Sequence, residues 1–297
     1  MHKTAFVFIV VCLLASVPGL SQTWDEVCSN GDYIWGEGWG RTIEEADREA
    51  LASLGSRITI AVSSSFIHTE DQRISSSGKD YASVTNSYLS LQSFTRLSNT
   101  SRIVQREGRR YHVGRWIRRD ALETLFSDRR ARALEYETLA EQAERELRLD
   151  AALRYHYWAY VMLGSLSRPA EVRDANGRML IVTIPERMNA IFSGLTVGAK
   201  KTGSTLSLDF RYKGAPIRGL DFTLFDGQRW SGPIPVRDGH AIAKLPAGAL
   251  GEIVQLKVEY AYSDEARLDD ELGAVLASAD TKPFRKSNII FRRDYFK

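Results

Sequence analysis

The residues best suited to bind a charged partner are arginines, which crowd into the stretch between residues 96 and 132. A guanidinium group makes planar, bidentate contacts to carboxylates and phosphates, and Tyr111 and Trp116 lie among these arginines. We therefore expect a basic face that docks an acidic partner. Its candidate residues are Arg102, Arg106, Arg109, Arg110, Arg115, Trp116 and Arg118.

The alternative is a solvated strand face whose charge is balanced by acidic side chains of the next segment. Charge reversal at Arg109 and Arg110 separates the two interpretations, because only a docking face would lose its partner. The net charge of +3 for the whole chain is too small to indicate a nucleic-acid partner. The balancing residues would be Glu135, Glu137, Glu141, Glu144 and Glu146.

Three glycines in Gly36-Glu-Gly-Trp-Gly40 precede a helical pattern and invite comparison with phosphate-binding loops. Their spacing matches neither G-x-G-x-x-G nor a loop that ends in Gly-Lys-Ser/Thr. We expect them instead to permit a bulge or close packing beneath Trp35 and Trp39. The glycines therefore predict no nucleotide cofactor.

No catalytic or metal motif is recognisable. The histidines lack metal-ligand spacing, and neither H-E-x-x-H nor G-x-S-x-G occurs. The serine runs at 63–65 and 75–77 have no base that the sequence pairs with them, and His156 is expected to be a packed core or boundary residue. We predict no catalytic residue, cofactor or metal; the alternative is a hydrolase whose site is assembled from residues distant in sequence. The histidines considered are His68, His112, His156 and His240.

Residues 1–21 have the pattern of a secretory signal peptide. A basic head with Lys3 precedes an apolar run, and Gly19 and Ser21 supply the small residues of a cleavage site after Ser21. The apolar run is too short to span a bilayer, and no later run is long enough, so no transmembrane segment is predicted.

The two cysteines do not indicate a disulfide framework. Cys12 lies early in the apolar run and follows valines rather than a small residue, which disfavours lipid attachment there. Cleavage would leave Cys28 alone, and a single cysteine forms no internal disulfide. We expect an exported protein stabilised by burial.

Residues 22–126 are predicted to form an α+β domain. Thr42 and Glu45 form a capping box that starts an amphipathic helix ending near Gly55. Alternating apolar residues from Ile58 to Phe66 then predict a strand. A hairpin over 101–118 closes a sheet of three or four strands, against which the helix packs.

The next two segments change in pattern. Residues 127–194 are predicted to form a helical connector, with a tetratricopeptide-like hairpin and a short helix from Pro185 to Phe192. Residues 195–297 show short strands separated by Lys213-Gly214, Asp226-Gly227 and Asp238-Gly239. This predicts an all-β immunoglobulin-like or transthyretin-like sandwich, followed by a helix and a last strand.

The stretch from about residue 33 to 126 resembles a family of bacterial envelope domains. These are the twenty-kilodalton outer-membrane lipoprotein-like domain and the N-terminal domain of a flagellar outer-membrane ring protein. The similarity rests on the glycines of 36–40, the Ala-rich helix 45–54, the segment 58–65 and the hairpin ending at Tyr111-His-Val-Gly-Arg-Trp-Ile117. The resemblance implies an envelope location and an assembly role, and supplies no functional residues.

Together these patterns predict a non-catalytic exported protein that binds or scaffolds within a cell-envelope assembly. It would reside in the periplasm or at the outer membrane, or be secreted. Its partner would be an envelope protein or an acidic envelope polymer, such as lipid A phosphates or wall polymer. The sequence sets no oligomeric state.

Overall fold

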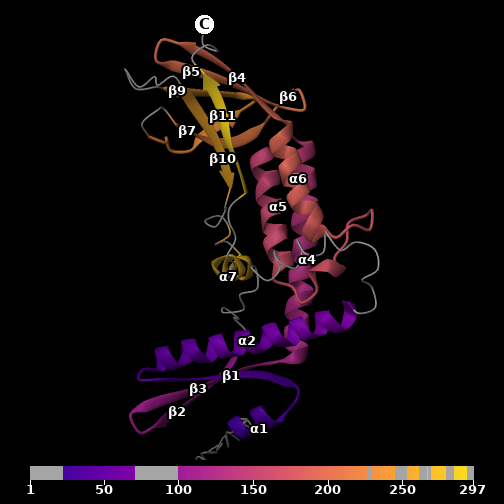
Figure 1. Cartoon of the computed structure of the whole chain (residues 1–297), viewed down its shortest axis with the longest axis vertical. Helices are drawn as coiled ribbons and strands as arrows, with labels where there is room; N and C mark the ends of the chain where they lie inside the picture. Colours follow the sequence, from indigo (N-terminus) through magenta and orange to yellow (C-terminus); the bar gives the residue numbers. More distant parts are fainter. Residues whose placement is uncertain are drawn as a thin grey trace, which may run out of the picture.

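The structure is a computed structural model that describes residues 23–70, 100–225, 229–244, 253–260, 266, 269–278 and 284–292. Along its longest axis, Figure 1 shows a small sheet crossed by one helix, then a helical bundle, then a curled antiparallel sheet. The fold is therefore mixed α and β, as predicted. The predicted signal peptide, the serine run 75–77 and the turn at 226–227 lie outside the described residues.

The N-terminal part is a three-stranded antiparallel sheet with strand order β1-β3-β2, and one face is covered by α2. The first strand pairs with the third, with Tyr33 opposite Arg118. The second strand also pairs with the third, with Glu107 opposite Arg110, which confirms the predicted hairpin over 101–118. The elements are α1 (Trp24–Ser29), β1 (Tyr33–Gly40), α2 (Ile43–Glu70), β2 (Ser101–Glu107) and β3 (Arg110–Arg118).

Helix α2 does not end near Gly55, and the strand predicted from Ile58 to Phe66 is wrong. Leu54 and Ile58, four residues apart, are both fully buried, whereas Ile60 is 66% exposed. In a strand, Ile58 and Ile60 would share a face; in the helix they do not. Burial of Leu54 and Ile58 against Ile34 of β1 outweighs the strand propensity of the β-branched run.

The start of α2 has the predicted N-cap, but the return bond of the predicted capping box comes from a different backbone donor. The backbone N–H of Glu45 donates to the Thr42 hydroxyl over 3.2 Å, so Thr42 is the N-cap. The Glu45 carboxylate accepts from the backbone N–H of Arg41 over 2.8 Å rather than from Thr42 itself. Two donors at the helix start are thereby satisfied.

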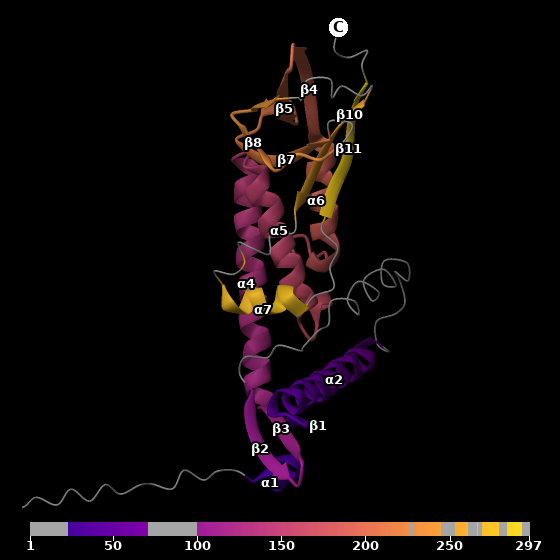
Figure 2. The same cartoon turned by 90° about the vertical axis from the view of Figure 1, so that its left-hand side faces the viewer.

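The bundle contains the predicted antiparallel helical hairpin, and α6 packs against its second helix (Figure 2). Helix α6 begins at Leu180, whereas the sequence predicts a helix that begins at Pro185. Pro185 lies inside the observed helix. The domain boundary predicted at 126/127 falls within a continuous helix. The elements are α4 (Arg119–Arg145), α5 (Leu149–Gly164), η1 (Pro169–Glu171) and α6 (Leu180–Gly194).

The C-terminal sheet has the order β11-β10-β7-β8-β9-β5-β4, with β6 paired to β5. Lys213-Gly214 and Asp238-Gly239 form the predicted turns, with φ between 49° and 86° at all four residues. The strand predicted over 288–291 is part of a longer strand that spans 284–292. The sequence pattern does not predict β4, β6 or β8. The strands are β4 (Leu195–Thr202), β5 (Thr205–Tyr212), β6 (Ala215–Pro216), β7 (Gly219–Phe225), β8 (Ile234–Arg237), β9 (His240–Lys244), β10 (Ile253–Tyr260) and β11 (Phe284–Arg292).

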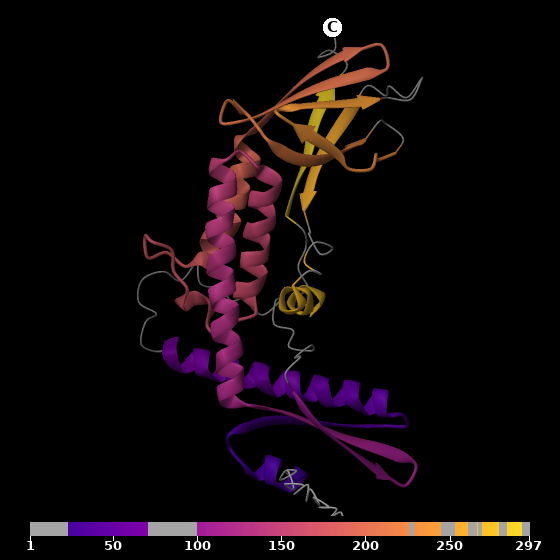
Figure 3. The same ribbon diagram turned by 180° about the vertical axis from the view of Figure 1, so that it is seen from behind.

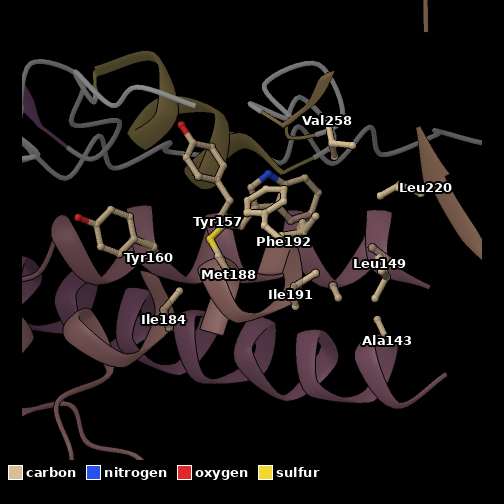
Figure 4. Packing of buried hydrophobic residues seen from close by; sticks show 14 of the residues in the cluster. Ala143, Leu149, Tyr157, Tyr160, Ile184, Met188, Ile191, Phe192, Leu220 and Val258 are labelled. Atoms are coloured by element: carbon tan, nitrogen blue, oxygen red, sulfur yellow. The ribbon is translucent and has the colours of Figure 1, made fainter. Parts of the chain in front are cut away.

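One continuous hydrophobic core joins the bundle to the C-terminal sheet. Tyr157, Met188 and Phe192 of the helices belong to the same buried cluster as Leu220 and Val258 of the sheet (Figure 4). Helix α7 (Asp270–Ser278) returns from the sheet to lie beside the bundle (Figure 3). The N-terminal sheet instead has its own small clusters under α2.

Candidate functional site

The glycines of β1 allow α2 to lie directly on the strand. A Cβ at Gly36 would be 2.7 Å from the carbonyl oxygen of Ala50, and one at Gly40 would be 2.5 Å from the backbone nitrogen of Ala46. Gly38 faces the same helix and has no room for a Cβ either. The three glycines occupy every second position of β1, so all three lie on the same face of the sheet. They permit close packing, as predicted, but against the backbone of α2 rather than beneath Trp35 and Trp39.

The opposite face of the sheet is aromatic and is covered by α1. The Trp24 ring lies over Gly114, where a Cβ would be only 2.5 Å from Trp24 Cε3. Trp35 and Trp116 flank Trp24, with ring centroids 5.5 Å and 6.2 Å away. The Trp24 indole thus occupies the space that the absent side chain of Gly114 leaves, and α1 also buries Val27.

His112 lies within this aromatic cluster and is 4% exposed. It stacks on Trp39 at 4.4 Å, and its Nε2 is 3.1 Å from a carboxylate oxygen of Glu37. Cys28 of α1 is half-buried nearby; burial, aided by the charges of Glu37 and Asp25, raises the pKa of its thiol. A raised pKa keeps the thiol protonated and poorly nucleophilic.

The strand register divides the seven candidate residues between two faces. Successive side chains of a strand point to opposite sides, so Arg102, Arg106 and Arg115 lie on the side of α2. Arg110, Trp116 and Arg118 lie on the side of α1, and Arg109 is in the turn. The structure therefore brings these residues to one hairpin but not to one face.

Three of the arginines near the base of the hairpin form ion pairs within the protein. Arg115 donates two 2.7 Å hydrogen bonds to Asp47 of α2, and Arg102 lies 3.9 Å from the same carboxylate. The hydrogen bonds from Arg115 hold the pKa of Asp47 below its usual range. Arg118 pairs with Asp120 over 2.7 Å. These charges are compensated by structural carboxylates.

The arginines at the end of the hairpin are different. We call residues 106–110 the hairpin tip. Arg106, Arg109 and Arg110 are exposed there, and none forms an ion pair with a carboxylate anywhere in the described ranges. The Arg106 guanidinium lies 5.8 Å from the centre of the Tyr111 ring. Glu107 is the acidic residue of the tip, which leaves three positive charges against one negative charge.

Sequence reasoning missed a buried polar cluster inside the bundle. His156, fully buried as predicted, has Nδ1 2.8 Å from a carboxylate oxygen of Glu137. The other Glu137 oxygen accepts from Arg187, which also bonds Glu141 over 2.6 Å. The alternative interpretation of the arginines has Glu137 balance their charge, but Glu137 is 5% exposed and pairs with His156 and Arg187 instead. A histidine in an apolar helix was the one signal that a buried partner was needed.

Among the described residues, no group of three or more His, Cys, Asp or Glu side chains is arranged to hold a metal ion. Within the same residues, no helix has both the length and the apolar character needed to cross a membrane.

Comparison with known proteins found no match to this chain among protein-family models, curated proteins or solved structures. The resemblance of residues 33–126 to envelope domains therefore stays a prediction.

Proposed function

We propose that this protein is a non-catalytic, exported component of a cell-envelope assembly, and that its hairpin tip docks an acidic envelope protein or polymer. The observation that carries the proposal is the difference between the two ends of the hairpin. Arg115 and Arg118 are paired with carboxylates, whereas Arg106, Arg109 and Arg110 have no ion pair among the described residues. Unpaired, clustered guanidinium groups favour a carboxylate- or phosphate-bearing partner.

The proposal extends to the architecture. The N-terminal sheet with α2 would act as the assembly module, in keeping with its resemblance to lipoprotein-like envelope domains. The curled C-terminal sheet would be an immunoglobulin-like or transthyretin-like sandwich module, joined to the first by a tetratricopeptide-like connector. Support comes from the antiparallel strand order and from the helical hairpin between the two sheets.

The test is retention of the mature protein on purified envelopes. The double charge reversal Arg109→Glu with Arg110→Glu should weaken retention by at least about tenfold, because like charges would then face the acidic partner. A matched control is Lys200→Glu with Lys244→Glu, which makes the same change in net charge at positions of the C-terminal sheet. The control should be retained like the wild type.

Crosslinking in native envelopes then identifies the partner. The proposal expects a reproducible acidic partner whose yield falls in the tip variant and at high salt, since exposed charge pairs are screened. Equal retention of both double variants, or recovery of the wild type as a free species, would contradict it.

A further inference from the structure

A pocket of about 430 Å³ lies where the N-terminal sheet meets the bundle. Its lining comes from four places in the chain: β1, α2, the first turns of α4 and the segment that follows α5. Figure 3 shows α2 crossing the start of α4 in this region. Ligand pockets of about 300–1,000 Å³ commonly lie between domains, so both size and position suit a small ligand.

The floor of the pocket is apolar. Ile34, Leu122, Leu166 and Val172 line it, and each is at most 6% exposed. Phe126 adds an aromatic ring from the same stripe of α4 as Leu122. Such a floor favours a ligand with a hydrocarbon portion, because apolar surface is removed from water when the ligand binds.

The rim of the pocket is lined by charged side chains, and its net charge is positive. It carries the exposed residues Arg119, Arg130 and Arg168 against Glu123 and Glu171, three positive charges against two negative ones.

The three rim arginines differ in what already binds them. Arg168 is 3.4 Å from Glu171, so its charge is partly compensated. Arg119 donates its Nε to the carbonyl oxygen of Gly31 over 2.8 Å, which orients its terminal nitrogens. Arg130 forms no ion pair within the part of the chain that the structure describes. Arg130 is therefore the rim cation best placed to accept an anionic group.

We propose that this pocket binds a single-chain anionic amphiphile, with its alkyl chain on the apolar floor and its carboxylate or phosphate head at Arg130. A folded protein partner would need a surface of about 800 Å² per partner, which a concave pocket of this size does not offer. The proposal concerns a site separate from the hairpin tip, so either can fail without the other.

Calorimetric titration of the mature protein tests the proposal, with decanoate and decyl phosphate as the anionic probes and 1-decanol as the neutral one. We expect saturable binding of one anion per chain and weaker binding of the alcohol. The ratio of the affinities for decanoate and decyl phosphate shows whether the pocket prefers a carboxylate or a phosphate head group.

Arg130→Glu should weaken binding of the anion at least about tenfold, since a favourable contact becomes a repulsive one. Ser127→Trp, in the pocket lining, should block binding sterically. Arg48→Glu is the matched control, an exposed arginine of α2 outside the pocket lining, and should bind like the wild type. Equal affinity for the alcohol, unchanged binding by Arg130→Glu, or no saturable binding below micelle formation would overturn the proposal.

Discussion

Arg115 of β3 and Asp47 of α2 form a two-point ion pair, with Nε and one terminal nitrogen each 2.7 Å from a carboxylate oxygen. The pair ties the sheet to the helix that covers it. Both side chains are more than four-fifths buried. An arginine that looked like part of a docking face is thereby assigned to the architecture.

Asp47→Asn should lower the free energy of unfolding by about 1–2 kcal/mol at neutral pH, because it removes charge-assisted hydrogen bonds. The pKa of Asp47 is lowered in the folded state, so the pair stabilises the protein above the unfolded-state pKa of about 3.9. That contribution is lost as the pH falls through the folded-state pKa. Urea unfolding should therefore show a difference between wild type and variant at pH 7 that shrinks in acid. A constant difference would contradict the assignment.

Gly38→Ala should destabilise the N-terminal sheet by about 3 kcal/mol or more, because the new methyl group would overlap the backbone of Ala46 and Ala50. Backbone atoms of a helix cannot move aside as a flexible side chain can. Gly31→Ala is the matched control, since no atom lies within 4 Å of the position that its new methyl group would take, and it should change stability by less than about 0.5 kcal/mol. Thermal unfolding followed by circular dichroism measures both.

Trp24→Ala should loosen α1 on the sheet, because the indole over Gly114 is one of its contacts there, beside the fully buried Val27. Cys28 would then lose the burial that raises its thiol pKa and would react faster with a disulfide reagent. The rate of thiol modification at pH 8 is the measurement. Unchanged reactivity in a folded Trp24→Ala protein would mean that other contacts hold α1.

Asp269→Asn should loosen the attachment of α7 to the bundle. Asp269 accepts hydrogen bonds from the Tyr136 hydroxyl and from Arg132, and it caps α7 through Glu271 and Leu272. Burial, together with Asp269, raises the pKa of Tyr136 to about 12. Removal of the negative charge should lower that pKa towards its ordinary value of about 10, as site-resolved tyrosine NMR across alkaline pH would report. A pKa that stays near 12 would leave burial as the whole cause.

Glu137→Leu should cost about 3–5 kcal/mol, because it leaves the buried His156 without its carboxylate and removes one of the carboxylates paired with Arg187, which keeps Asp174 and Glu141. Glu141→Ala removes another of the three carboxylates near Arg187, but Glu141 is 46% exposed and should contribute less than about 1 kcal/mol. Chemical denaturation of the two variants gives the comparison. Similar costs would indicate that the cluster acts through Arg187 alone.

Several elements were predictable because their signals are local. The turns at Lys213-Gly214 and Asp238-Gly239 need residues that tolerate positive φ, and the sequence supplies them. The hairpin over 101–118 follows from alternation around a glycine turn. By contrast, β4 contains Gly198, Lys200 and Lys201, a composition with weak strand propensity, and it forms because β5 pairs with its whole length.

The local pattern thus decided where α2 starts, where the chain turns at 213–214 and 238–239, and that 101–118 folds as a hairpin. Tertiary contacts decided that α2 continues past Gly55, because burial of Ile58 on the sheet outweighs a β-branched run. They also decided which arginines remain unpaired, since Asp47 reaches Arg115 only through the docking of α2. The pairing of His156 with Glu137 has the same origin, because two helices must pack before a buried imidazole meets a carboxylate.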